Sequence, residues 1–508
     1  MSFNCNSTAD VDEWFSYDKD GRMTDMWEKT PHSGQYYHSV ATYFENGRVK
    51  TLQLASPSLY TMTYGLDGEG RWNSLTEATA TLVSGATFPP ASTCSGQPCT
   101  VVSLNGTDKD AYTFDPNTGR MTQYVFTVGS NSMTGGLVWN QNGTLQKLAI
   151  TDGFNAGGTQ TCNYNPTAAS GTGYDDWGRL VGFDCGSGQW GQAFGYDIYD
   201  NLTKTVLSGR NGTTWNPGYN AANNHCTGCT YDADGNVTGD GNNVYGWDMF
   251  SKLAWTATSG TPTCGTSGRC ATYDAFGRIV EQSNGSSWTE RWITPLGETA
   301  YMNGATISYA YWPAAAGGTA LVTGNGGTTN YQHLDWLGNA RVASTVFNHS
   351  ITADRAYSPF GEQYDTFGSL ASQYGTFAGI DGNFDPGVMW DTPNRELSTV
   401  GRWLSPDPAR AGWNQYAYVT NPNSVIDPTG LSGGCSDAVL SGGARPNGDC
   451  YDPCSLDGGN NCDGGGGSGG GGGEVEEAME EATLMLYRVG SAISINRSQT
   501  LLIHPYTV

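Results

Sequence analysis

Hydrophobic and polar residues alternate in short runs along much of the chain, the spacing that turns one face of a β-strand toward a core. In one run, Tyr124, Phe126 and Val128 fall on the same face. Farther on, residues 279–282 and 288–292 flank Asn284-Gly285 and predict a hairpin with an Asn-Gly turn. We therefore expect a protein built from short antiparallel strands.

A short unit recurs between these runs. It consists of an aromatic residue, Asp or a related residue, two variable residues, Gly, then Arg or Asn, and an apolar residue. Gly accepts the positive φ of a tight turn, and the Asp side chain can accept hydrogen bonds from backbone N–H groups two residues on. A series of such hairpins can bury an aromatic face that one hairpin cannot bury alone. Copies begin at Tyr17, Tyr43, Phe114, Trp139, Tyr174, Tyr196, Tyr231 and Tyr273.

The composition agrees with strands and turns. Of 508 residues, 72 are Gly, aromatic residues make up 12% and charged residues only 14%, which does not suit a helical bundle. The net charge of −24 opposes direct binding of nucleic acid or of an anionic membrane surface.

Nothing in the sequence encodes a membrane span or a signal peptide. No stretch of about 18 consecutive apolar residues occurs, and Met1–Asp12 has no apolar core. Because a repeat motif begins as early as Tyr17, we expect either a chain that starts inside a repeat array or an export route that needs no N-terminal signal.

The chain has 13 cysteines, a density that fits an oxidising compartment. Connectivity cannot be derived from sequence alone. Four pairs are close in sequence or could be joined across strands, and four more cysteines crowd the tail. These are Cys94 with Cys99, Cys162 with Cys185, Cys226 with Cys229 and Cys264 with Cys270, and then Cys435, Cys450, Cys454 and Cys462.

Two motifs raise the question of a metal. Cys226 and Cys229 form a CxxC beside His225, but no second ligand pair stands at a suitable spacing, which favours a disulfide or free thiols over metal binding or redox catalysis. The run Asp232–Asn236 could suggest a calcium loop, but Val237 stands where such a loop needs Gly. We expect structural turns, no metal and no cofactor.

The repeats over roughly residues 15–330 resemble the YD/RHS-repeat family, and the chain from Tyr331 resembles the RHS repeat-associated core domain. The resemblance implies a β-solenoid that spirals into a hollow cocoon, with the core domain curled inward as a plug. Several members are shells of toxins, including polymorphic toxins and the C component of insecticidal toxin complexes. The core-domain motifs are Tyr331–Val342, Tyr357–Glu362, Phe377–Gly379, Gly401–Pro408, Asn414–Val419, Asn421-Pro422 and Asp427–Leu431.

The same resemblance implies an aspartyl autoprotease that cuts after the Leu of Asp-Pro-x-Gly-Leu. Asp407 and Asp427 match its two aspartates, and Leu431–Ser432 is then the scissile bond. Two close carboxyl groups share one proton, so one can activate water while the other protonates the carbonyl oxygen.

The sequence departs from the family pattern near these residues. The family's assisting Arg falls at Asn394, and Arg395 takes its place if one residue is deleted before Gly401. The family's Tyr-Tyr-Asp-Pro run is absent. The alternative is that Asp407-Pro408 and Asp427-Pro428 only begin rigid turns.

Beyond Leu431 the composition changes. Residues 432–473 form a Cys- and Gly-rich linker, and residues 474–508 form a variable tail. Apolar residues spaced by three or four predict an amphipathic helix over Glu474–Val489. The tail holds no nucleophile–base pair and no metal cluster, so we expect a docking or degenerate segment rather than a toxic enzyme.

Together these features predict an all-β YD/RHS β-solenoid or partial β-cocoon of stacked hairpins over residues 1–330, followed by a core domain over 331–431. The predicted function is a shell of a secreted or cell-surface toxin system that cuts itself after Leu431. Its partners would be its own enclosed C-terminal tail and a second shell protein that completes the cocoon. A surface adhesin that binds glycans through aromatic repeats, and an inactive truncated remnant, stay open as alternatives.

Overall fold

The computed structural model describes residues 11–56, 60–164, 173–323, 329–368, 376–381, 389–410, 412–431, 434–435, 494–496 and 500–502. In this part of the chain the helical elements are two single 3₁₀ turns, η1 (Ala156–Gly158) and η2 (Ala315–Gly317). The all-β prediction is therefore confirmed. The helix expected over Glu474–Val489 and most of the linker lie outside the described residues.

The first sheet is an antiparallel meander in which strands pair with their neighbours in sequence, while the short strands β8 and β15 pair at its margins with β9 and β16. Its strands are β1 (Asp12–Tyr17), β2 (Met23–Lys29), β3 (Tyr37–Tyr43), β4 (Val49–Ser56), β5 (Tyr60–Leu66), β6 (Trp72–Glu77), β7 (Ala80–Thr87), β8 (Thr93–Cys94), β9 (Gln97–Leu104), β10 (Lys109–Phe114), β11 (Met121–Val128), β12 (Asn131–Trp139), β13 (Leu145–Asp152), β14 (Gln160–Asn163), β15 (Gly173–Tyr174), β16 (Leu180–Asp184), β17 (Gly191–Tyr196) and β18 (Leu202–Val206).

The second sheet is another antiparallel meander, and it runs without a break through residue 331, where the core-domain motifs begin. Its strands are β19 (Thr230–Tyr231), β20 (Val237–Gly239), β21 (Val244–Trp247), β22 (Leu253–Ala257), β23 (Arg269–Tyr273), β24 (Ile279–Asn284), β25 (Ser287–Thr294), β26 (Gly297–Asn303), β27 (Thr306–Pro313), β28 (Thr319–Thr323), β29 (Thr329–Leu334), β30 (Ala340–Thr345), β31 (Ser350–Tyr357) and β32 (Gln363–Gly368).

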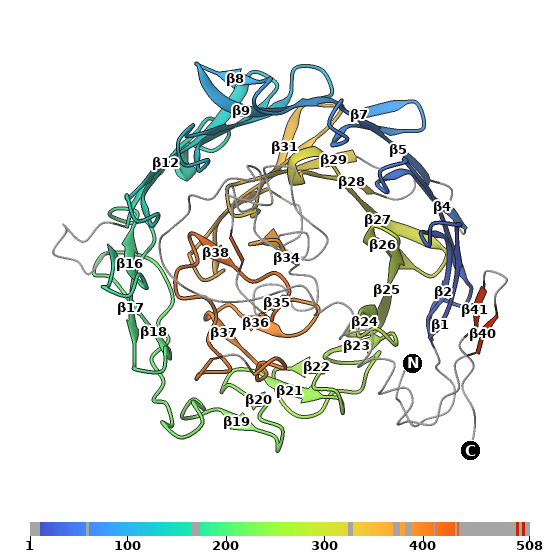
Figure 1. The fold of residues 1–508 in the computed structure, drawn as a ribbon. Helices are drawn as coiled ribbons and strands as arrows, with labels where there is room; N and C mark the ends of the chain where they lie inside the picture. Colours follow the sequence, from blue (N-terminus) through green and yellow to red (C-terminus); the bar gives the residue numbers. More distant parts are fainter. Residues whose placement is uncertain are drawn as a thin grey trace, which may run out of the picture.

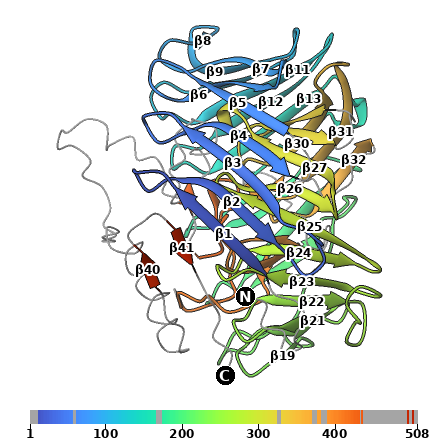
Figure 2. The ribbon, with the colours of Figure 1, turned by 90° about the vertical axis from the view of Figure 1, so that its right-hand side faces the viewer.

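The two sheets form a spiral. Figure 1 shows the first sheet around the outside of a ring, and the second sheet continuing the curve and passing inside the first. Figure 2 shows the strands of both sheets slanting across the wall of the ring. Contacts between the coils agree, since Tyr37 of β3 packs on Trp292 of β25 with ring centroids 5.2 Å apart. All six residues of β29 are buried, as expected for a strand covered on both faces.

Short strands of the core segment, which we define as residues 376–431, lie within the ring (Figure 1). They are β33 (Thr376–Phe377), β34 (Ile380–Asp381), β35 (Met389–Asp391), β36 (Glu396–Ser398), β37 (Arg402–Trp403) and β38 (Val425–Ile426), and β39 (Gly434–Cys435) follows at the start of the linker. Strands β33–β37 form a small antiparallel sheet, and β38 pairs with β39. The interior is therefore filled in part by the segment that the sequence predicts to be a plug.

The repeat unit forms the predicted turn. At the first copy, Asp18 Oδ1 accepts the N–H groups of Asp20 at 2.9 Å and Arg22 at 3.0 Å, and Gly21 has φ +79°. Asp18 Oδ2 also accepts a hydrogen bond from Arg22 Nε at 2.7 Å, a pairing that the sequence analysis missed. The Asp18 and Arg22 side chains, at the two ends of the turn, thus hold the turn closed.

Successive units are joined through their aromatic residues. The indole of Trp139 donates to the Met121 carbonyl oxygen at 2.7 Å, and the Tyr196 hydroxyl donates to the Leu180 carbonyl oxygen at 2.8 Å. In each case the acceptor belongs to the last residue of the preceding unit. The preceding arginine lies over the same ring, as Arg120 does 5.2 Å from the Trp139 centroid. The aromatic residue therefore links hairpins through its polar edge as well as its apolar face.

The hairpin expected near residue 284 is present, with its turn shifted by one position. Strands β24 and β25 pair antiparallel, and Asn284 lies opposite Ser287. Asn284 therefore ends the strand, and Gly285, at φ +61°, begins the two-residue loop. The buried face of β11 is as expected, because Tyr124, Phe126 and Val128 are all buried.

Four disulfides join cysteines within the described residues, and all four are pairs considered from the sequence. They are Cys94–Cys99, Cys162–Cys185, Cys226–Cys229 and Cys264–Cys270.

The run after Tyr231 is a turn rather than a calcium loop. Asp232 Oδ1 accepts the N–H groups of Asp234 and Asn236 at 3.0 and 2.8 Å, so hydrogen-bond donors occupy the atoms that a cation would need. No group of three or more His, Cys, Asp and Glu in the described part of the chain is arranged to hold a metal. The same residues contain no helix with the length and apolar character needed to cross a bilayer.

The described part of the C-terminal tail lies on the outside of the ring. Strands β40 (Ser494–Asn496) and β41 (Thr500–Leu502) form a hairpin, and β41 pairs antiparallel with β1 (Figure 1). A first strand has an open edge that can accept another strand. For these residues, the expectation of a tail enclosed by the shell is therefore wrong.

Candidate active site

Three charged side chains meet inside the core segment. Arg395 Nη2 lies 3.7 Å from Asp407 Oδ2 and 3.5 Å from Asp427 Oδ2. All three residues are buried, with 5%, 6% and 3% of their surface exposed. The structure thus brings together the three residues that the sequence singled out, at a site largely shielded from water.

Short strands and turns hold each group in place. Arg395 directly precedes β36, Asp407 follows β37, and Asp427 follows β38. The Asp407 N–H donates to the Gln415 carbonyl oxygen at 3.0 Å, and Arg395 Nη1 donates to the same oxygen at 3.2 Å. Asp407 Oδ1 accepts the Ala409 N–H at 2.9 Å. One backbone carbonyl group therefore orients both the arginine and the first aspartate.

The second aspartate binds the backbone next to the predicted cleavage position. Asp427 Oδ1 accepts the N–H groups of Gly430 at 2.9 Å and Leu431 at 3.2 Å. Arg395 Nε donates to the Gly430 carbonyl oxygen. The arginine and the aspartate thus hold the residues just before the Leu431–Ser432 bond, of which Ser432 lies outside the described residues.

Gly430 is required by this arrangement. Its φ is +75°, a region that favours glycine. A Cβ at this position would lie 2.3 Å from Thr392 Oγ1 and 3.1 Å from the Arg395 backbone nitrogen. The glycine of the Asp-Pro-x-Gly-Leu motif therefore allows the loop to approach Arg395 closely.

The structure distinguishes between the two candidates for the assisting residue. Arg395 faces both aspartates, whereas the side-chain amide of Asn394 donates to the Thr429 carbonyl oxygen at 3.0 Å. The Arg395 guanidinium also lies 4.4 Å from the ring centroid of Trp403. Sequence reasoning missed the contributions of Asn394, Trp403 and Gln415, because two of these contacts use backbone carbonyl groups and the third uses an aromatic face.

Burial sets the electrostatics of the site. It raises the pKa of the Asp427 carboxyl, and this effect outweighs the Arg395 charge and the backbone N–H groups that lower the pKa. Burial also lowers the pKa of the Arg395 guanidinium, against the attraction of both aspartates. Asp427 is therefore suited to hold a proton close to the Leu431 backbone.

Backbone pairing holds the chain on both sides of Leu431. Val425 lies opposite Cys435, and Ile426 opposite Gly434, in the β38–β39 pair. Residues 427–431 thus directly follow one strand of a short two-stranded ladder, and the Asp427 carboxylate lies against the backbone of Gly430 and Leu431. This arrangement permits acid–base chemistry on the protein's own backbone.

No protein-family model and no curated protein matches the sequence. Several solved structures share the fold. One is a Photorhabdus luminescens Tc holotoxin pore with a substitution in TccC3 (TM-score 0.64, 15% identity, covering 81% of this chain and 23% of that chain). A second is TcdB2-TccC3-Cdc42 (TM-score 0.65, 15% identity, covering 84% of this chain and 24% of that chain). A third is TcdB2-TccC3 without the hypervariable C-terminal region (TM-score 0.64, 14% identity, covering 84% of this chain and 24% of that chain). The chain thus spans about a quarter of the length of these chains.

Proposed function

We propose that this protein is a shell component of a toxin-complex assembly and that its core segment cuts its own backbone after Leu431. The observation that carries the proposal is the meeting of Arg395, Asp407 and Asp427 around the Gly430–Leu431 backbone. Rigid turns alone would not require two buried carboxyl groups to face one arginine.

The proposed reaction is a hydrolysis. Asp407 takes a proton from a water molecule, the water oxygen adds to the Leu431 carbonyl carbon, and Asp427 donates its proton to the carbonyl oxygen. The C–N bond to Ser432 then breaks, the leaving nitrogen takes up the proton from Asp407, and the former carbonyl oxygen returns its proton to Asp427 as the C=O bond re-forms. Arg395 favours the state in which one of the two carboxyl groups is ionised.

Holding the substrate loop in place favours this reaction. Because the Leu431–Ser432 bond belongs to the same chain and residues 427–431 directly follow the paired strand β38, no binding step precedes the chemistry. The same pairing, with that of β41 to β1, would keep the C-terminal product docked after the cut.

The shell role rests on the spiral of two sheets and on its likeness to solved Tc toxin components. The chain spans about a quarter of those chains, and the partner that we propose for it is a second shell protein. The disulfides support a secreted or cell-surface protein, since such bonds persist in oxidising compartments.

The test is intact-mass spectrometry of the purified wild-type chain beside Asp407→Asn and Asp427→Asn. We expect a wild-type fragment that begins at Ser432, and both variants intact. Asp115→Asn, which changes an exposed turn carboxylate, is the control and should cut like wild type. A wild-type chain that stays whole on long incubation, or a cut Asp407→Asn variant, would contradict the proposal.

A further inference from the structure

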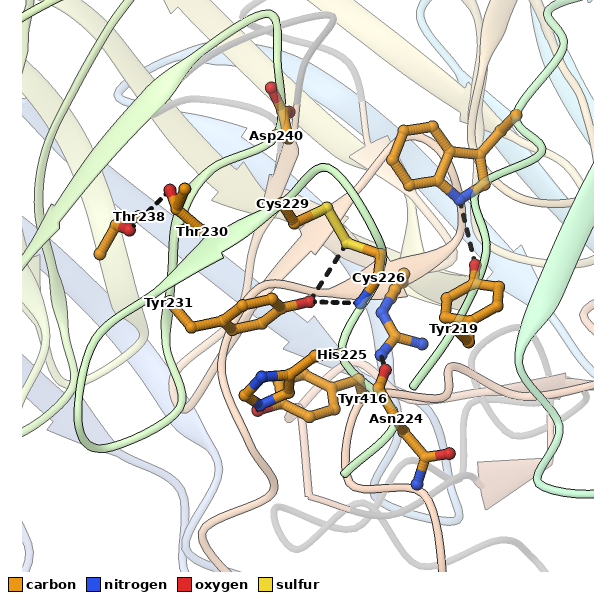
Figure 3. The surroundings of a disulfide bond; sticks show 12 residues. Tyr219, Asn224, His225, Cys226, Cys229, Thr230, Tyr231, Thr238, Asp240 and Tyr416 are labelled. Atoms are coloured by element: carbon orange, nitrogen blue, oxygen red, sulfur yellow. Dashed lines mark hydrogen bonds between the residues drawn. A yellow bond between two sulfur atoms is a disulfide. The ribbon is translucent and has the colours of Figure 1, made fainter. Parts of the chain in front are cut away.

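The Cys226–Cys229 disulfide lies in the segment that connects the two sheets, between the end of β18 and the start of β19 (Figure 3). Both cysteines line a cavity of about 430 Å³. The cavity is also bounded by Trp215 of the connecting segment and by Trp403 of the core segment. Its volume falls in the range of small-molecule pockets.

The two sulfur atoms have different surroundings. Cys226 is buried, with 5% of its surface exposed, whereas Cys229 is half-buried. The Cys226 Sγ lies 3.1 Å from the Tyr231 hydroxyl (Figure 3). That oxygen already accepts the Cys226 N–H at 2.9 Å, which leaves the hydroxyl hydrogen free to point at the sulfur.

Further contacts hold Tyr231 in this position. The His225 ring stacks on it with centroids 3.6 Å apart and planes at 11°. His225 Nε2 in turn shares a hydrogen bond of 3.0 Å with the Tyr416 hydroxyl of the core segment. Arg402 donates to the Asn224 carbonyl oxygen and faces Tyr231, which adds a positive charge near the buried sulfur.

We propose that Cys226–Cys229 is a thiol-exchange site, at which the thiolate of a low-molecular-weight thiol enters the cavity, attacks Cys229 Sγ and displaces Cys226 as a thiolate. The Cys226–Cys229 S–S bond breaks, its electron pair goes to Cys226 Sγ, and a new S–S bond joins Cys229 to the thiol. Tyr231 stabilises the departing thiolate by donating its O–H. A second thiol molecule then attacks the mixed disulfide. This releases Cys229 as a thiol and leaves the reductant as its own disulfide.

The short spacing of the two cysteines favours exchange. A disulfide stabilises a fold mainly by limiting the unfolded chain, and this effect is smallest for short loops. The two cysteines here are separated by only 3 positions in sequence, so little stability is lost when the bond opens. A shell that is oxidised after export would thus be reduced first at this disulfide when it enters a thiol-rich compartment.

Two other disulfides serve as internal controls. Cys94–Cys99 and Cys264–Cys270 each also join one buried cysteine to one more exposed cysteine. Their sequence separations of 5 and 6 are similar. Neither bond lines the cavity around Cys226.

The experiment treats the full oxidised chain with reduced glutathione at neutral pH, then quenches with acid, alkylates free thiols and maps peptides by mass spectrometry. We expect glutathione on Cys229 and not on Cys226. Cys226–Cys229 should open about tenfold faster than the two control disulfides, the size expected for one hydrogen bond to a charged group. Equal rates at all three bonds, or glutathione on Cys226, would overturn the proposal, and neither measurement requires a variant.

Tyr231→Phe removes only the hydroxyl group. We expect opening of Cys226–Cys229 to slow about tenfold, with the two control disulfides unchanged, which also reports on the integrity of the fold. Tyr36→Phe, on an exposed ring just before β3, is the matched control and should leave all rates as in wild type. An unchanged rate at Cys226–Cys229 in Tyr231→Phe would show that the hydroxyl plays no part in the exchange.

Discussion

Lys204 of β18 and Glu362, just before β32, form a buried ion pair with Nζ and Oε2 3.1 Å apart. The Lys204 side chain is fully buried and that of Glu362 is 6% exposed. Ser358 also donates its hydroxyl to Glu362 at 2.8 Å. This pair therefore joins the end of the outer coil to the end of the inner coil, across 158 positions of sequence.

Removing one member of this pair should cost more than removing both. Lys204→Met leaves the Glu362 carboxylate buried without its cation, and we expect a loss of about 3 to 5 kcal/mol in the free energy of unfolding. The double variant Lys204→Met/Glu362→Leu should recover much of that loss, because it leaves no uncompensated charge. Urea denaturation followed by tryptophan fluorescence measures both. A double variant less stable than Lys204→Met would contradict this account.

Arg395 should control the rate of self-cleavage. Arg395→Gln removes the charge that faces both aspartates, and we expect cleavage to slow by about 10²- to 10³-fold. Arg395→Lys keeps a charge but loses the planar guanidinium group, so its cleavage rate should fall between those of wild type and Arg395→Gln. Gel densitometry over time gives the rates. The control is Arg48→Gln, which lies over Trp72 in the repeat region and should cleave normally.

Cleavage should be faster in acid. Since burial raises the pKa of Asp427, its protonated form extends to higher pH than for an ordinary Asp. The rate should therefore decline as pH rises through this raised pKa. The slow Arg395→Lys variant can be purified uncut and transferred to buffers of different pH, where the rate of fragment formation is followed. A rate that increases steadily with pH would rule out Asp427 as the proton donor.

Glu13 should make the fold less stable as pH rises toward neutrality. Burial, and then the charge of Asp274, raise the pKa of Glu13 to about 7 from 4.5, against the opposing charge of Arg278. Between these two values the folded state binds more protons than the unfolded state. The contribution of Glu13 to stability is therefore complete at pH below 4.5 and is lost as pH rises through about 7.

The shift corresponds to a change of up to about 3 kcal/mol in the free energy of unfolding. Glu13→Gln should flatten this part of the curve of stability against pH, whereas Glu45→Gln, at an exposed position, should leave it unchanged. Chemical denaturation at closely spaced pH values gives the curve. A slope that survives in Glu13→Gln would assign the effect to another group.

The turns of the repeat units were predictable from sequence because each turn is closed by contacts within a few residues. The Asp18 carboxylate reaches only as far as Arg22, and Gly21 needs only its own positive φ, so the motif contains every atom that the turn needs. Cys226 and Cys229, three positions apart, were a candidate pair for the same reason, although the sequence left a disulfide and free thiols both open. The all-β class, the hairpins and the candidate aspartates followed from such local patterns and from the resemblance that they carry.

The meeting of distant segments depended on tertiary structure. Whether Asn394 or Arg395 faces Asp407 and Asp427 was open in the sequence, since neighbouring residues in an extended backbone point to opposite sides. Likewise, Lys204 meets Glu362 only because of how far the spiral has turned between these two residues. The angle through which the spiral turns is the sum of small twists between many neighbouring strands. A local motif specifies each corner, but only the assembled coils determine which corners come to lie side by side.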